Sequence, residues 1–108
     1  MATSYKVLGQ SNPAATTDTT LYTVPVATEA VVSTITVANL GTSGTFRIAI
    51  RPDGAAIANQ HYVVYDATLN ANDTITFTLG ITINASDVIT VRASNTSFAF
   101  QAFGSEIA

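Results

Sequence analysis

The segment Thr45–Arg51, TFRIAIR, alternates between apolar side chains and others along its length. Successive side chains of a β-strand point to opposite faces of a sheet, so Phe46, Ile48 and Ile50 share one face. Two arginines and an alanine occupy the other face. This period of two predicts a strand with one face toward a core and one toward water or a partner.

The same period recurs along nearly the whole chain, whereas a sustained period of 3.6 residues does not. In the segment 73–79, DTITFTL, Ile75, Phe77 and Leu79 alternate with threonines, and we expect these three side chains to point into the core. In the segment 31–38, VVSTITVA, we expect the odd-numbered residues to share one face.

Turn residues separate the expected strands. Pro13 and Pro25 end a ladder because proline has no N–H to donate. The segment 39–44, NLGTSG, predicts a hairpin because its two glycines tolerate positive φ. Strands are expected to start near Tyr5, Thr19, Val31, Thr45, Gln60, Asp73, Asp87 and Ser97. Together these signals predict one all-β domain over 1–108, an antiparallel β-sandwich (jelly-roll-like or Ig-like) of about eight short strands, with residues 1–3 frayed.

The composition is poor in charge. Charged residues make up 10% of the 108 residues, against roughly 25% in a typical soluble domain. The net charge of −3 argues against nucleic-acid and anionic-membrane binding, which need a basic surface. The absence of cysteine excludes disulfides and thiolate metal sites. Because the apolar runs are short, we expect no signal peptide and no transmembrane helix.

The residues that carry chemistry do not form a catalytic set in the sequence. His61 is the single histidine, and a triad or a zinc site needs partners for it, so we interpret it as a structural or interface residue. Five of the seven carboxylates fall in expected turns or at chain ends, where bonding to the backbone explains them. We therefore expect a non-enzymatic protein without cofactor. A surface Ca²⁺ ion held by Asp side chains stays an alternative, although no continuous ligand loop is present.

Outward aromatic and cationic residues are candidates for an interface. Arg47 and Arg51 share the outward face of one strand, where they serve either solubility or an acidic neighbour. An outward aromatic ring often anchors a partner, and the alternative is a tyrosine with a buried ring and a hydrated hydroxyl. The candidate interface residues are Tyr5, Tyr22, Arg47, Arg51, Tyr62 and Phe103.

The order of several short segments resembles one known family. These segments are LYTVP at 21–25, VVSTITV at 31–37 with Asn39, FRIAIRP at 46–52, QHY at 60–62, YD at 65–66, NDTI at 72–75, LGIT at 79–82, DVITV at 87–91, SF at 97–98 and FGSE at 103–106. They resemble the small structural proteins of tailed-phage virions, of the capsid decoration (cement) or tail accessory type, over nearly the whole chain. At 25–29 the sequence PVATE replaces the tighter Pro-Ala-Gly turn expected for the family.

The resemblance implies a β-sandwich carried on a virus particle, with no catalytic residues to transfer. We expect a capsid decoration protein that is assembled in the host cytoplasm and contacts the major capsid protein or other virion proteins. Few lysines guard its sheet edges, so we also expect a homo-oligomer, and the habits of phage decoration proteins favour a trimer. The alternatives are a tail, baseplate or fibre component, and a host-surface carbohydrate-binding module that uses Tyr62 or Phe103.

Overall fold

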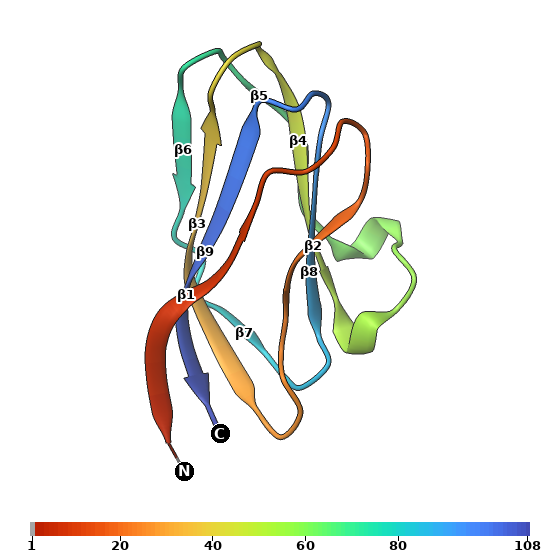
Figure 1. The fold of residues 1–108 in the computed structure, drawn as a ribbon. Coiled ribbons are helices and arrows are strands. Elements are labelled where there is room, and N and C mark those ends of the chain that lie inside the picture. Colours follow the sequence, from red (N-terminus) through yellow and green to blue (C-terminus); the bar gives the residue numbers. More distant parts are fainter. Residues whose placement is uncertain (1) are drawn as a thin grey trace.

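Nine strands in two antiparallel sheets make up the fold in the computed structural model, which describes residues 2–108 (Figure 1). The first sheet contains β1 (Thr3–Ser11), β3 (Glu29–Asn39), β6 (Thr74–Phe77), β7 (Ile81–Ile83) and β9 (Phe98–Ile107). The second sheet contains β2 (Thr19–Thr23), β4 (Gly44–Arg51), β5 (Tyr62–Leu69) and β8 (Val88–Ala93). Two short 3₁₀ turns, η1 (Pro52–Gly54) and η2 (Asn59–His61), lie between β4 and β5. The predicted antiparallel sandwich is confirmed.

The strand order is that of a jelly roll. It runs β1-β9-β3-β6 in the first sheet and β2-β8-β4-β5 in the second, so that β1 pairs with β9, β2 with β8, β3 with β6, and β4 with β5. These nested pairs distinguish a jelly roll from the Ig-like alternative. The additional strand β7 pairs with β3 over Ala30–Val32, beyond the β6 pairing over Ile35–Ala38. β6 and β7 thus share one edge of β3, with Gly80 at positive φ between them.

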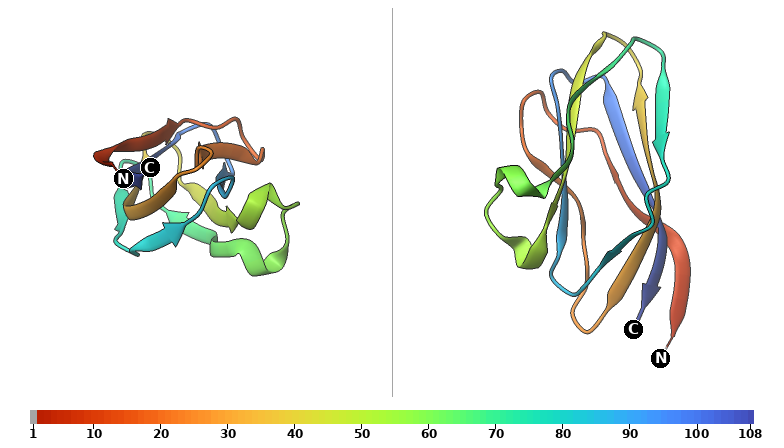
Figure 2. Two further views of the ribbon diagram at one scale, coloured as in Figure 1. Left: turned by 90° about the horizontal axis from the view of Figure 1, so that it is seen from below. Right: turned by 180° about the vertical axis from the view of Figure 1, so that it is seen from behind.

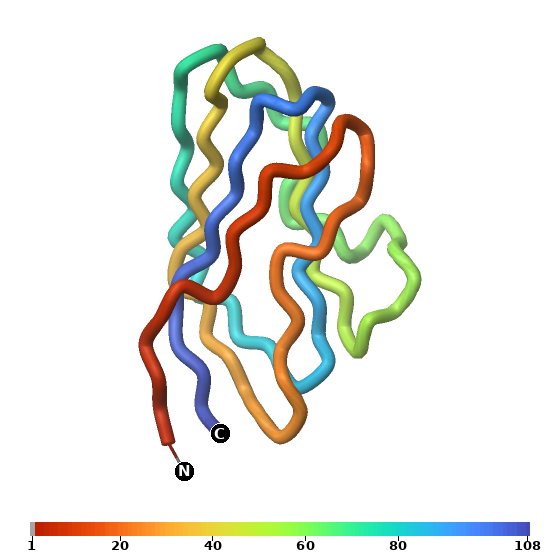
Figure 3. Tube along the Cα trace, in the orientation of Figure 1, coloured from red at the N-terminus to blue at the C-terminus, as the bar shows by residue number. Residues whose placement is uncertain are grey.

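The segment 39–44 does not close a hairpin, and that prediction is wrong. It joins β3 of the first sheet to β4 of the second and crosses the end of the sandwich (Figure 3). Asn39 is buried there, and its Nδ2 donates to the carbonyl oxygens of Thr42 at 2.8 Å and Leu69 at 3.0 Å. A glycine-rich turn reverses the chain equally well within one sheet or between two, so its local chemistry does not decide which.

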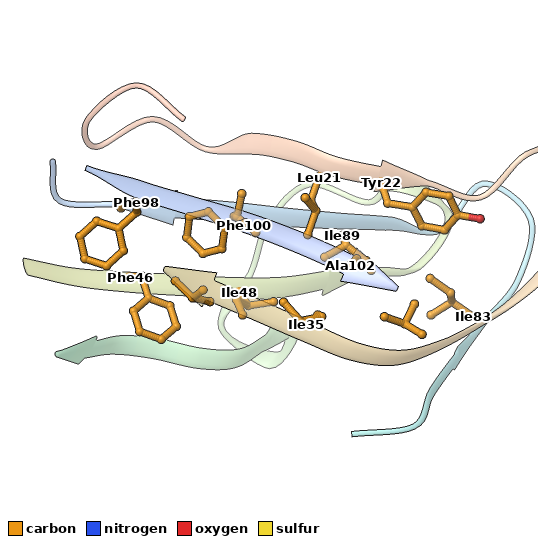
Figure 4. Packing of buried hydrophobic residues seen from close by; sticks show 14 of the residues in the cluster. Leu21, Tyr22, Ile35, Phe46, Ile48, Ile83, Ile89, Phe98, Phe100 and Ala102 are labelled. Carbon is orange, nitrogen blue, oxygen red and sulfur yellow. The ribbon is translucent and has the colours of Figure 1, made fainter. Parts of the chain in front are cut away.

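The core lies between the two sheets (Figure 4). Phe46, Phe98 and Phe100 fill one end, with the Phe46 centroid 6.0 Å from that of Phe98 and 6.1 Å from that of Phe100. Aliphatic side chains from both sheets continue the core toward Tyr22 and Ile83 at the other end. Each fully buried aliphatic or phenyl side chain contributes roughly 1.5–3 kcal/mol to folding.

A β-bulge in β3 changes which of its residues face the core. The register against β9 shifts next to Ser33, so Val32 and Ile35 are both buried although one number is even and the other odd. The expectation that odd-numbered residues of this segment share a face is therefore wrong. The Ser33 hydroxyl donates to the carbonyl oxygen of Phe103 at 3.1 Å and occupies the bulge. The extra residue of a bulge changes the phase of alternation.

The expectation that Ile75 and Leu79 lie in the core is also wrong. They are 36% and 49% exposed, because β6 is an edge strand and ends at Phe77, before Leu79. Phe77 itself packs against the core, with its ring centroid 6.1 Å from that of Phe46. The alternation identified the inward face correctly, but the rim of the sandwich leaves part of that face uncovered.

The two ends of the chain lie side by side (Figures 1 and 3). The N–H of Ala2 donates to the carbonyl oxygen of Ala108 at 2.9 Å, and the N–H of Ala108 donates back at 2.9 Å. Thr3 pairs with Ile107 in the ladder of β1 and β9. The expected fraying at 1–3 is thus wrong for Ala2 and Thr3, and Met1 lies outside the described residues.

Candidate functional site

The outward residues of β1, β9 and β3 form a neutral surface, which we call the β1–β9–β3 face. Tyr5 is 85% exposed and Val7 is 48% exposed, and Val7 is paired with the half-buried Phe103. Gln10 Nε2 donates to Gln101 Oε1 at 3.0 Å across the same two strands. The face therefore has an apolar centre with uncharged polar side chains beside it.

Charge is almost absent from this face. In the part of the chain that the structure describes, Glu29 at the start of β3 is the one charged residue at an outward position of these strands. Lys6, the single lysine of the chain, belongs to the opposite side of β1, and its Nζ lies 2.6 Å from Glu106 Oε1. A partner that covers the face away from Glu29 therefore desolvates no ion.

A second cluster lies on the outer side of β4 and β5. Arg47 Nε donates to Asp66 Oδ1 at 2.7 Å, and Nη2 donates to Oδ2 at 3.2 Å. The Arg47 guanidinium carbon lies 4.2 Å from the centroid of the Tyr65 ring, and the Tyr62 ring meets the Tyr65 ring edge to face at 4.8 Å. A register shift between β4 and β5 and a positive φ of 51° at Asp66 produce this grouping, because the bulge brings Tyr65 and Asp66 opposite Arg47.

The ion pair shifts the pKa of both partners. The hydrogen bond to Asp66, followed by the Coulomb attraction of its carboxylate, raises the pKa of Arg47. The same hydrogen bond lowers the pKa of Asp66. Both groups are therefore charged at neutral pH. Because the pair is partly open to water, its value lies in fixing geometry more than in stability.

Two hollows adjoin this cluster. One, of 460 Å³, is lined by Asn59, Tyr62 and Tyr65. The other, of 140 Å³, is lined by the Arg47–Asp66 pair together with Arg92 and several hydroxyl groups. These hydroxyl groups belong to Thr16, Thr45 and Ser94. Aromatic rings and groups that form directional hydrogen bonds thus surround the Arg47–Asp66 pair.

Arg51 has a different role on the same face of β4. Its Nε donates to the carbonyl oxygen of Ala55 at 2.7 Å, its Nη2 to that of Gly54 at 3.0 Å, and its Nη1 to Thr90 Oγ1 at 3.1 Å. These bonds hold the segment 52–61, which projects beside β4 and β8 (Figure 2). Arg51 is thus engaged within the chain, and the structure does not bring it together with Arg47 and Tyr62.

Asp87 and His61 hold the same segment. The carboxylate of Asp87 accepts the N–H of Asp53 at 2.8 Å and that of Asn84 at 2.8 Å. Nδ1 of the buried His61 accepts the N–H of Ala58 at 3.1 Å. These bonds agree with a structural interpretation of the histidine.

Among the candidate interface residues, the structure brings Arg47 and Tyr62 together and places Tyr5 and Phe103 on the neutral face. Tyr22 is not on an outer face, and that expectation is wrong. A register shift between Thr20 and Tyr22 turns both Leu21 and Tyr22 toward the core, where Tyr22 is 7% exposed. Its hydroxyl donates to Glu106.

Sequence reasoning missed Tyr65 as a site residue. Simple alternation gives no signal for the bulge that places its ring over Arg47. The dipeptide Tyr65-Asp66 at a strand position was the available clue, because aspartate tolerates positive φ better than most residues do.

Within residues 2–108, no three His, Asp or Glu side chains gather as ligands of a metal ion, and no helix has the length and apolar character needed to cross a membrane. Comparisons of the chain with protein-family models, with curated proteins and with solved structures found no significant match.

Proposed function

We propose that this chain is a non-enzymatic structural subunit of a tailed-phage virion, a capsid decoration protein attached to the shell. The observation that carries the proposal is the neutral β1–β9–β3 face, which exposes Tyr5 and Val7 beside Phe103. Free proteins usually protect the edge strands of their sheets with charges, lysine above all, and the edge strand β1 carries one lysine, Lys6. A face that carries, among residues 2–108, a single charged residue at one end suits burial against other subunits, because little hydration of charge is lost there.

The fold and the sequence resemblance agree with this proposal. Double-sheet jelly rolls recur in viral capsid proteins, and also in lectins, so the fold alone does not select a function. The ordered segments that resemble tailed-phage virion proteins favour the first of these two classes. We propose that the chain is assembled into the virion in the host cytoplasm.

The carboxylates support a non-enzymatic role because most of them are already engaged. Asp87 accepts two backbone N–H groups, and Asp73 accepts the N–H of Thr74 at 2.9 Å. Asp66 and Glu106 are paired with Arg47 and Lys6. A general acid or base has to be free to exchange a proton with a substrate.

Multivalency gives such a protein firm attachment. We propose that the β1–β9–β3 face joins copies of the chain into a closed homo-oligomer, with three copies as our first choice. Linked copies that contact equivalent sites of the major capsid protein convert a modest single-site affinity into lasting attachment. The proposal includes no contact with nucleic acid or membrane.

The number of copies in purified particles tests the proposal. Particles of the phage that encodes the chain are separated on a gradient, and the chain is quantified against the major capsid protein by mass spectrometry. A copy number that matches the symmetry of the shell supports the decoration role. A few copies per particle would instead support the alternative, a tail, baseplate or fibre component. Absence from the particles would refute a virion role.

A further inference from the structure

We propose that the outer side of β4 and β5 binds a neutral saccharide, which stacks on the ring of Tyr65. Tyr65 is 58% exposed and borders the 460 Å³ hollow that Asn59 and Tyr62 also line. We call these three residues, with Arg47 and Asp66, the Tyr65 site. It lies on the sheet opposite the β1–β9–β3 face, so it does not depend on the function proposed above.

The Tyr65 ring is held in place before any ligand arrives. The Arg47 guanidinium lies 4.2 Å from the centroid of this ring, and the Tyr62 ring meets it edge to face at 4.8 Å with an interplanar angle of 78°. Tyr65 remains 58% exposed despite these two contacts, so part of the ring surface stays open to a ligand. A fixed ring loses little conformational freedom when a ligand binds.

A pyranose fits such a ring because of its own geometry. One side of the sugar presents several C–H groups, whose positive hydrogens face the negative π-surface of an aromatic ring. The hydroxyl groups project from the edge of the sugar and need donors and acceptors at fixed positions. An aromatic surface with a few well-placed polar groups is the usual composition of a small-ligand site.

The polar groups of the site are available around this ring. The two bonds between Arg47 and Asp66 use Nε and Nη2 of the guanidinium, so Nη1 keeps its N–H groups for a sugar hydroxyl. The carboxylate of Asp66 retains acceptor capacity, and the side-chain amide of Asn59 supplies both a donor and an acceptor. The bidentate pair fixes the direction of these groups.

The charges favour a neutral saccharide over an acidic one. Arg47 is paired with Asp66, and Arg92 Nη1 lies 3.5 Å from Asp18 Oδ1, so two cations are balanced by two anions. A phosphate or an acidic sugar would meet carboxylates as well as guanidinium groups. The 140 Å³ hollow beyond the Arg47–Asp66 pair offers hydroxyl groups to a second sugar unit.

An array of immobilised neutral, sialylated and sulfated oligosaccharides tests the proposal, followed by calorimetric titration of the intact protein with the neutral glycan that binds best. We expect neutral glycans to bind and Tyr65→Ala to weaken the binding at least roughly tenfold. The control is Leu40→Ala, which shortens an apolar side chain that is 69% exposed in the segment 39–44, outside both the Tyr65 site and the β1–β9–β3 face, and should leave the affinity unchanged. Asn59→Ala should weaken binding while circular dichroism reports an unchanged fold.

Several results would overturn the proposal. A silent array would do so, as would binding restricted to acidic glycans, which would indicate anion binding by the arginines. Equal affinities of the wild type and Tyr65→Ala, or equal losses in Tyr65→Ala and Leu40→Ala, would show that the ring of Tyr65 is not the contact. If the array is silent and Tyr65→Ala impairs attachment to particles, the site binds a protein instead.

Discussion

Tyr22 and Glu106 connect the two sheets across the end of the core, 84 positions apart in the sequence, through a hydrogen bond of 2.5 Å from the phenol hydroxyl to Oε2. Lys6 pairs with the other carboxylate oxygen at 2.6 Å. The hydrogen bond from Lys6, followed by that from Tyr22, lowers the pKa of Glu106. Burial, followed by the hydrogen bond to Glu106, raises the pKa of Tyr22. The first and last strands are thus joined to β2 by one carboxylate.

The lowered pKa of Glu106 predicts a loss of stability in acid. The folded state binds fewer protons than the unfolded state here, so the stabilisation is complete above the unfolded pKa of about 4.3 and is lost as the pH falls through the folded pKa. Urea denaturation at a series of pH values should show a smaller acid loss for Glu106→Gln than for the wild type. Glu29→Gln is the control, because Glu29 is exposed and lies in no described ion pair. If the unfolding free energies of the wild type and Glu106→Gln fell equally with pH, Glu106 would not be the source of the acid loss.

Tyr22→Phe removes only the hydroxyl from the same contact. We expect the unfolding free energy at pH 7 to fall by about 1.5–3 kcal/mol, as for other hydrogen bonds to a charged group. Because the folded pKa of Tyr22 is raised, its stabilisation is present below the unfolded pKa of about 10 and is lost as the pH rises toward the folded value. The variant should therefore lose less stability in alkali. Tyr62→Phe, whose ring lies on the outer side, serves as the control, and equal urea midpoints for the two variants would argue against the role of the contact.

Truncation of Phe46 and of Phe77 to alanine should lower the free energy of unfolding by different amounts. Phe46 is 1% exposed and its ring lies near those of Phe77, Phe98 and Phe100, so Phe46→Ala should cost about 3–5 kcal/mol. Phe77 lies in an edge strand and is half-buried, so Phe77→Ala should cost clearly less. Thr76→Asp, on the outward side of β6, should be tolerated. Urea midpoints measure all three, and a greater loss for Phe77→Ala would contradict the described core.

The sequence predicted the layers of the fold because period-2 alternation records which face of each strand is buried. It could not predict where that period slips. Leu21 and Tyr22 both point inward, and Val32 and Ile35 do so across Ser33, because bulges depend on the pairing with β8 and β9. Such pairing is a long-range property of the fold, and no local signal reports it.

Alternation predicted part of the candidate site, and a bulge again accounts for the part that it missed. Arg47 and Tyr62 stood out as an outward cation and an outward aromatic. The ring of Tyr65 joins them only because β5 contains a bulge with Asp66 at positive φ. Arg51 was expected to share the role of Arg47, but the length and course of the segment 52–61 bring backbone carbonyls within its reach.

Arg51→Ala should release the segment 52–61. Three hydrogen bonds from the guanidinium to Gly54, Ala55 and Thr90 are lost, and we expect destabilisation by about 1.5–3 kcal/mol. Limited proteolysis should then cleave within 52–61, and amide exchange at Ala58 should accelerate. Arg51→Lys should not restore protection, because a single ammonium cannot reproduce the planar fork. Arg47→Ala is the control, and it should leave this segment protected; equal cleavage in both arginine variants would contradict the role of Arg51.

The assembly prediction rests on two valines of nearly equal exposure. Val7 is 48% exposed on the β1–β9–β3 face, and Val63 is 47% exposed in β5 of the other sheet. If copies pack through the neutral face, Val7→Asp places a carboxylate in the contact and should yield monomers of 11.2 kDa by light scattering at micromolar concentration. Val63→Asp adds the same charge outside the contact and should keep the wild-type mass. Circular dichroism should show that both variants fold, because both positions are open to water. A monomeric wild type would refute self-association in solution. Dissociation by Val63→Asp alone would indicate that the copies pack through the second sheet.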